Sequence, residues 1–185
     1  EAHPGGTVKY RDLTSLLTGH LDSPAVQTLR FGTPAAPEAE AEAELLLYEE
    51  LVSEFLAADI VVVGAPMYNF SIPSQLKTWL DVVAQKGRTF KYTEKGPEGL
   101  AGDKQVVIVS SRGGIYSVSP GSAMDFQEPY LAAVLRFFGI ERIDVIRAEG
   151  VNISPEKREA AMSEAHQQIG KLFASVGGGD AKSIA

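Results

Sequence analysis

One stretch of this chain, residues 59–83, combines a buried strand, a loop and an amphipathic helix. Its strand is Ile60–Val63, four consecutive β-branched apolar residues. Such an unbroken run is typical of a strand buried on both faces in a parallel sheet. Gly64–Pro66 then ends the strand, because proline cannot continue a central ladder, and a helix with one apolar face begins near Pro73. The loop Met67–Phe70 therefore lies at the carboxyl end of a parallel strand, where open α/β sheets bind ligands.

The same alternation of strand and helix runs through the rest of the chain. Three helices beyond that one are expected, over residues 38–57, over residues 130–138, and from a cap at Ser154 to about Val176. The further strands are expected at Val8–Leu13, at Gln105–Ser110 and at Ile143–Ala148, with a hairpin-like excursion between residues 87 and 102. This order predicts an α/β fold with a doubly wound parallel sheet, helices on both faces, and one domain spanning residues 6–176. The glycine-rich tail, residues 177–185, is expected to be flexible.

Composition narrows the functional classes. The 185 residues carry a net charge of −7, which argues against nucleic acid or an anionic membrane surface as a partner. No apolar run approaches the length of a membrane span. Cysteine is absent and the three histidines are isolated, so neither a thiolate nucleophile nor a helical metal site is expected. The absence of cysteine fits a cytoplasmic protein.

The loop after the strand at residues 60–63 offers the chemistry of a planar ligand site. It contains Met67, Tyr68, Asn69 and Phe70, which supply a thioether, two aromatic rings and an amide. Apolar groups can cover the faces of a heteroaromatic ring, and a few directed hydrogen bonds can hold its rim. The alternative is structural: Met67 and Phe70 belong to the core and Tyr68 caps a loop.

A second loop follows the strand at residues 105–110 and consists of Ser111, Arg112, Gly113 and Gly114. Two adjacent glycines free the backbone and let a flat ligand approach the amides closely. The alternative is a tight turn that needs glycine for its conformation alone. Because both loops follow parallel strands, they are expected side by side, and together they favour a flat cofactor.

Several motifs in these regions carry a family resemblance. The chain resembles the FMN-dependent NADH azoreductases, also called FMN-dependent NADH:quinone oxidoreductases, from about Val8 to about Val176. The motifs that carry it are Ala65–Phe70 followed by Pro73 and Gln75–Lys77, then Thr89–Glu94 with Gly96–Leu100, and then Ser111–Gly114.

The resemblance implies a flavodoxin-like fold, a homodimer, and FMN held where residues 67–70 and 111–114 meet. Tyr92 and Phe137 would shape the substrate pocket, one of them across the dimer. NADH, or NADPH, would reduce the flavin, which would then reduce a quinone or an azo compound in a ping-pong cycle. The cofactor performs this chemistry, so no catalytic acid or base is named; backbone N–H groups would stabilise the reduced ring.

The resemblance also implies an initial strand and a serine-rich loop that holds the FMN phosphate at a helix N-terminus. This sequence begins near the position of the second strand. The expectation is a fragment whose first roughly 35 residues precede Glu1. Two other functions stay open: an electron carrier with the flavodoxin-like fold, and an interaction module without a cofactor.

Overall fold

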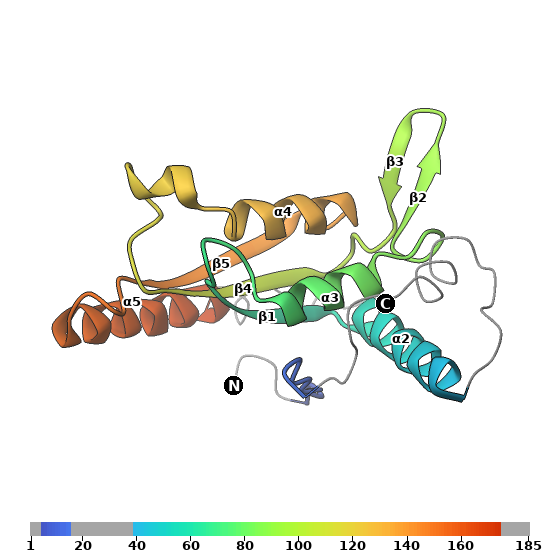
Figure 1. The fold of residues 1–185 in the computed structure, drawn as a ribbon, viewed down its shortest axis with the longest axis horizontal. Coiled ribbons are helices and arrows are strands. Elements are labelled where there is room, and N and C mark those ends of the chain that lie inside the picture. Colours follow the sequence, from blue (N-terminus) through green and yellow to red (C-terminus); the bar gives the residue numbers. More distant parts are fainter. Residues whose placement is uncertain (1–4, 16–38, 175–185) are drawn as a thin grey trace, which may run out of the picture.

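The computed structural model describes residues 5–15 and 39–174. Its centre is a parallel sheet of β1 (Ile60–Pro66), β4 (Gln105–Arg112) and β5 (Arg142–Glu149), in the order β1-β4-β5 (Figure 1). The strands run in register, with Ile60 opposite Gln105 and Pro66 opposite Ser111. Their carboxyl ends therefore lie at one edge of the sheet, and this confirms the predicted parallel arrangement.

Helices cover both faces of this sheet, as predicted. The helices are α2 (Ala39–Ala57), α3 (Ser74–Val83), α4 (Glu128–Phe137) and α5 (Pro155–Ala174), with a short 3-10 helix η1 (Gly121–Met124) before α4. Val106 and Ile108 of β4 pack with α2, α3 and α4, whereas Val107 packs with Ala165 of α5 on the other face. Alternate residues of β4 thus serve two separate cores, which explains its uninterrupted apolar sequence. None of the helices in the described ranges has both the length and the apolar composition to span a bilayer.

The excursion after α3 is a two-stranded antiparallel hairpin of β2 (Phe90–Thr93) and β3 (Gly96–Gly99), as predicted. It projects away from the sheet at the end opposite the loop that follows β1 (Figure 1). The hairpin is anchored at its base, because Thr89 is fully buried and its hydroxyl donates to the carbonyl of Val83, 2.7 Å away. The predicted cap of α5 is also confirmed, since the Ser154 hydroxyl accepts the N–H of Lys157 at 3.2 Å.

Three expectations about the strands were wrong. β1 continues through Pro66, and it is not buried on both faces, because 62% of Val62 is exposed on a side that no described helix covers. β4 includes Ser111 and Arg112, which were assigned to the loop. Residues 8–13 form no strand: Val8 is 90% exposed, and no described strand lies beside this segment to supply a ladder. The tail at 177–185 lies outside the described residues.

Candidate functional site

The two predicted ligand loops lie side by side, which confirms their expected proximity. They leave adjacent strands at paired positions, Pro66 and Ser111. The N–H of Met67 then donates to the carbonyl of Ser111 at 2.8 Å, so the first residue beyond β1 is tied directly to the end of β4. Residues 67–70 and 111–114 therefore form one continuous rim at the carboxyl edge of the sheet.

The loop after β1 is a tight turn with an unusual backbone. The N–H of Tyr68 donates to the carbonyl of Ser71 at 2.9 Å, and the N–H of Ser71 donates back to Tyr68 at 3.1 Å. Between them Asn69 has φ 48° and Phe70 has φ 71°. Asparagine tolerates this left-handed region, but an aromatic residue is strained there, by on the order of 1–2 kcal/mol. Surrounding structure must hold the strain, and the N–H of Phe126 does so by donating to the Phe70 carbonyl at 3.0 Å.

The loop after β4 is clamped by the segment that follows β5. The carbonyl of Gly114 accepts the N–H of Gly150 at 2.8 Å, and that of Gly113 accepts the N–H of Asn152 at 3.1 Å. A Cβ on Gly113 would lie 2.9 Å from the side-chain nitrogen of Asn152, and one on Gly114 would lie 3.2 Å from the ring of Tyr116. A side chain at either position would therefore require a neighbouring side chain to shift, Asn152 beside Gly113 and Tyr116 beside Gly114.

The two loops leave hydrogen-bond donors and aromatic surface available to a ligand. Within the described part of the chain, the N–H groups of Asn69, Phe70, Gly113 and Gly114 donate to no other residue. Tyr68 is 62% exposed and Phe70 is 40% exposed. Directed N–H groups beside exposed aromatic rings are what a planar ring with carbonyl oxygens and ring nitrogens requires.

Sequence reasoning missed the aromatic neighbour of this turn, Tyr116. Its ring meets that of Phe70 edge to face, with the centroids 6.0 Å apart. Tyr116 comes only two residues after the predicted loop, inside a stretch that has no periodicity, so the sequence contained no pattern that would have selected it.

Arg112 was predicted as a cofactor-binding residue together with its loop, but its side chain is fully buried beneath the site. Its Nη2 lies 2.9 Å from Asp125 and 2.6 Å from Glu128, and Nη1 lies 3.8 Å from Glu149. Burial alone would raise the pKa of Glu128, but hydrogen bonds from Arg147 and Ser110 and the charge of Arg112 outweigh it and hold that pKa below its ordinary value.

Glu149 belongs to the same buried group and fixes the chain beyond Gly114. Its carboxylate accepts the N–H groups of Tyr116 and Ser117, at 2.9 and 3.1 Å, and also the Ser117 hydroxyl. Burial raises the pKa of Glu149, yet these hydrogen bonds overcome it and the pKa lies below the ordinary value. The carboxylate is thus held ionised as the anchor of this segment.

Tyr92 and Phe137, the predicted substrate-pocket residues, lie together but away from the two loops. Phe90 joins them: its ring centroid is 5.5 Å from that of Tyr92 and 4.6 Å from that of Phe137. This aromatic group sits where the hairpin meets the end of α4, whereas α4 begins beside Phe126 and the turn at Phe70. Ten residues of helix separate the two places, about 15 Å along the axis.

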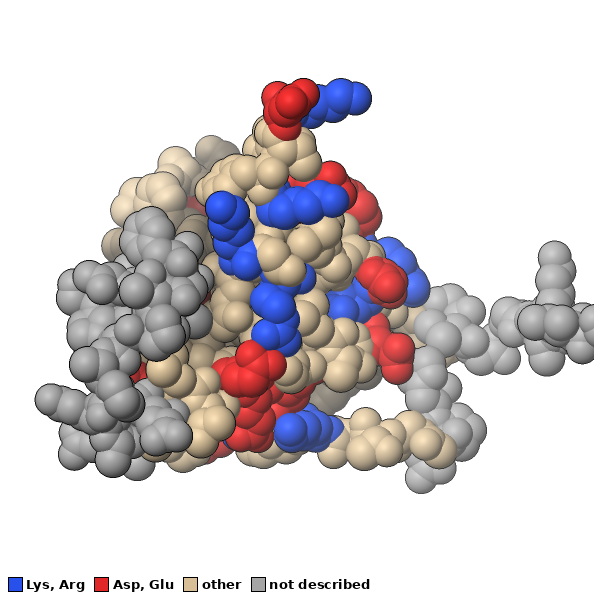
Figure 2. All heavy atoms as spheres, turned by 90° about the vertical axis from the view of Figure 1, so that its right-hand side faces the viewer, with Lys and Arg blue, Asp and Glu red and all other residues tan. Residues whose placement is uncertain are grey.

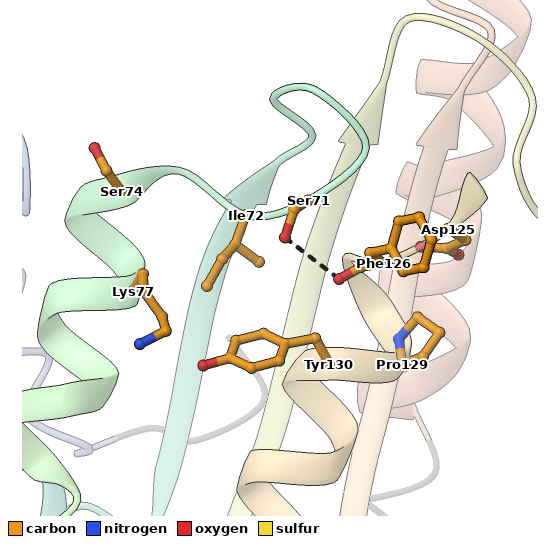
Figure 3. A pocket seen from close by; sticks show the side chains of 8 residues that line it. All are labelled: Ser71, Ile72, Ser74, Lys77, Asp125, Phe126, Pro129 and Tyr130. Carbon is orange, nitrogen blue, oxygen red and sulfur yellow. Dashed lines mark hydrogen bonds between the residues drawn. The ribbon is translucent and has the colours of Figure 1, made fainter.

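A cavity of about 550 Å³ opens next to the turn, between the first residues of α3 and those of α4 (Figure 3). In Figure 3 the Lys77 amine and the Tyr130 hydroxyl point toward one another across it. Burial would lower the pKa of Lys77, but its hydrogen bonds to Asp81, at 2.6 and 2.7 Å, keep that pKa above the ordinary value. The remaining lining residues are Ser71, Ile72, Ser74, Asp125, Phe126 and Pro129.

Comparisons with known proteins agree with this geometry. A family described by a flavodoxin-like fold matches residues 1–173. The FMN-dependent NADH:quinone oxidoreductase of Azospirillum brasilense is 49% identical over 177 residues, which are 95% of this chain and 85% of that protein. The chain belongs to the flavodoxin-like FMN-dependent NADH:quinone oxidoreductases. The oxidoreductase of the same name from Ralstonia nicotianae is 51% identical over 164 residues, 89% of this chain and 79% of its own length.

Solved structures of this family superpose on the chain. A crystal structure of the azoreductase AzrA matches with a TM-score of 0.85 at 31% identity, over 94% of this chain and 84% of that one. A structure of an FMN-dependent NADH-azoreductase from Bacillus anthracis in complex with FMN matches with a TM-score of 0.77 at 27% identity, over 88% of this chain and 79% of that one. The predicted fold class and family are both confirmed.

The described site fits the ring of the family's cofactor. Its unpaired N–H groups lie on both loops, at Asn69 and Phe70 and at Gly113 and Gly114, so they can reach different parts of one ring rim. The exposed rings of Tyr68 and Phe70 supply apolar contact at the same edge.

Proposed function

We propose that this chain is an FMN-dependent oxidoreductase that passes reducing equivalents from NADH to quinones and azo compounds. The observation that carries the proposal is the pair of adjacent loops, residues 67–70 and 111–114, which present unpaired N–H donors and exposed aromatic surface at one edge of the sheet. Relatives at about 49–51% identity bear the name of this activity.

When bound, FMN would accept the reducing equivalents of NADH and release them to the acceptor in a second, separate half-reaction. The residues of this chain would bind the FMN ring and orient it. The N–H groups of Asn69 and Gly113, which donate to no described residue, would donate to the ring rim, where negative charge grows on reduction. Such preorganised donors act most strongly where water is excluded. We assign no side chain the role of acid or base, because the cofactor itself carries the reaction.

We also propose that the working form is a homodimer in which each site draws on both chains. Tyr92 and Phe137 lie at the far end of α4 from the ring loops of their own chain, about 15 Å along the helix. Across a two-fold interface the same aromatic pair can instead face the ring loops of the second copy. Tyr92 is 65% exposed on the projecting hairpin, as such a contribution requires.

The surface around the ring loops supports this interface. Large apolar side chains gather there without cover: Tyr68, Phe70, Ile115, Val118, Met124 and Phe126 are each at least 40% exposed. An exposed apolar group of this extent is typical of an interface rather than of a free monomer surface. Figure 2 shows the other end of the molecule, from which the hairpin with Tyr92 projects; there positive and negative side chains are interspersed with uncharged surface.

The activity is tested by loading the full-length protein with FMN and following NADH oxidation with a simple quinone. The proposal predicts stoichiometric FMN binding and turnover whose double-reciprocal plots are parallel, as a ping-pong cycle requires. FMN binding without turnover would instead favour an electron carrier. Failure to bind FMN would favour an interaction module.

The shared site is tested by mixing two inactive variants. Gly113→Val damages the ring loops and Tyr92→Ala removes the aromatic contribution, so each homodimer has two defective sites. When the two variants pair at random, half of the dimers are heterodimers. In each heterodimer one of the two sites would have both its ring loops and its aromatic residue unchanged. Recovery of about a quarter of the wild-type activity is therefore expected. No recovery, with dimers present by light scattering, would contradict a site built from both chains.

A further inference from the structure

We propose that Arg112 is a positioning residue for the flavin ring: its buried guanidinium holds both ring loops in place without reaching the ring. This inference rests on the proposed function of residues 67–70 and 111–114 as the ring site. Arg112 was predicted as a cofactor-binding residue together with its loop; the inference gives its side chain a role beneath that loop. Arg112 is the largest of the fully buried side chains in the described part of the chain, and it occupies the last position of β4.

The first connection runs to the loop after β1. Arg112 Nε donates to the side-chain oxygen of Gln127 at 2.9 Å and to the Ser110 hydroxyl at 3.1 Å. The amide nitrogen of the same Gln127 donates to the carbonyl of Ala65, two residues before the turn begins at Met67. Gln127 is fully buried, so this link is shielded from water.

A second connection reaches the same loop through the start of α4. Arg112 Nη2 lies 2.9 Å from one oxygen of Asp125. The other Asp125 oxygen accepts the N–H groups of Gln127 and Glu128, at 3.0 and 3.3 Å, and thereby fixes the helix start. Phe126, between these residues, donates its N–H to Phe70. The strained turn is therefore held by a segment that Arg112 holds.

The third connection secures the loop after β4. Arg112 Nη1 faces Glu149 at 3.8 Å, and Glu149 accepts the N–H groups of Tyr116 and Ser117. The carbonyl of Arg112 itself accepts the N–H of Val151 at 3.2 Å. One cation thus meets partners from two other segments, residues 125–128 and Glu149 of β5, as well as Ser110 of its own strand. Within the described residues Nη1 and Nη2 make no hydrogen bond, so they act on the three carboxylates by charge, while Nε makes the directed bonds to Gln127 and Ser110. A lysine ammonium cannot combine these roles, because it is a single point charge on a flexible stem.

The test compares Arg112→Lys with the wild type as FMN-loaded full-length protein, at a temperature well below unfolding. We expect the FMN dissociation constant to rise at least about tenfold, since small displacements of positioning groups have effects of this size. At saturating FMN, we also expect a lower kcat with NADH and quinone and a visible circular dichroism spectrum closer to that of free FMN. Arg142→Lys, at the opposite end of the sheet beside Gln105, is the matched control and should behave as the wild type.

Three results would show whether Arg112 positions the flavin ring or only stabilises the fold, and whether the proposed function itself is wrong. If Arg112→Lys lowers only the melting temperature, while the saturated kcat and the flavin spectrum stay unchanged, Arg112 is merely structural and the inference is overturned. If Arg112→Lys does not fold, Gln127→Met decides, because it cuts the first connection, from Arg112 through Gln127 to Ala65, and leaves the carboxylates of the other two connections in place. A smaller change in the same direction supports the inference, and no change overturns it. A wild type that binds no FMN overturns the proposed function and this inference together.

Discussion

The contact between the hairpin and the end of α4 leaves no room for a side chain at Gly99. A Cβ built there would lie 2.1 Å from the backbone nitrogen of Gly139 and 2.2 Å from the carbonyl carbon of Phe138. Ordinary van der Waals contact begins at 3.4 Å, so Gly99→Ala requires the hairpin and the helix end to separate by about 1.3 Å (3.4 − 2.1). Both neighbours are backbone, which cannot rotate aside.

The cost of this separation can be bounded from the same contact. The N–H of Ala101 donates to the carbonyl of Phe138 at 2.9 Å, and Ala101 is 2% exposed, so a weakened bond is not replaced by water. Overpacking of this kind costs about 1–3 kcal/mol and a compromised buried hydrogen bond about 1–3 kcal/mol. Since the two overlap, we expect Gly99→Ala to lower the free energy of unfolding by about 2–4 kcal/mol, against a typical total of about 5–15 kcal/mol.

Urea denaturation followed by far-UV circular dichroism measures this loss. The matched control is Gly64→Ala, which makes the same substitution inside β1, where a Cβ meets nothing within 4 Å. It should change the free energy of unfolding by less than about 1 kcal/mol. A loss below about 1 kcal/mol for Gly99→Ala as well would refute the packing argument, and with it the fixed placement of the hairpin that carries Tyr92.

Two further predictions concern stability. Glu128 has a folded pKa below its ordinary value, so it stabilises the protein above the unfolded pKa of about 4.5 and loses that contribution as the pH falls through the folded value. Stability measured against pH should therefore fall less steeply below that pH for Glu128→Gln than for the wild type, and an equally steep fall would contradict this role. Thr89→Val leaves the carbonyl of Val83 and the N–H of Gln85 without their buried hydroxyl partner. It should lower the free energy of unfolding, measured by urea denaturation, by about 1–3 kcal/mol. Thr89→Ser keeps the hydroxyl, so an equal loss in that variant would contradict this origin.

Much of the fold was readable from the sequence because its strands and helices have strong local patterns. In the valine-rich run at 105–110, residues 105–108 are buried on both faces, as the composition indicates, although Val109 further along is 36% exposed. The run at 60–63 is also made of valine and isoleucine, yet Val62 is exposed. Burial depends on the elements that pack against a strand, which the strand's own sequence does not specify. The failed strand at 8–13 has the same cause, since an alternating pattern forms a strand only beside a partner.

The positions of the two loops of the candidate site could be predicted from the sequence, but the buried residues that hold these loops could not. The positions of both loops follow from topology alone, because carboxyl ends of parallel strands meet. The inward turn of Arg112 does not follow, since its partners Asp125, Glu128 and Glu149 are 13 to 37 residues away and come together only in the folded chain. The left-handed conformation of Phe70 was equally hidden, because nothing in its residue type favours it.

The most direct test of the account is a titration of the full-length, isotope-labelled protein with FMN, followed by amide chemical shifts. We predict the largest shifts at the N–H groups of Asn69, Phe70, Gly113 and Gly114, which are the donors assigned to the ring rim, and little change along the exposed face of α5. Tight FMN binding that leaves these four amides unmoved would contradict the assignment of the two loops to the flavin ring.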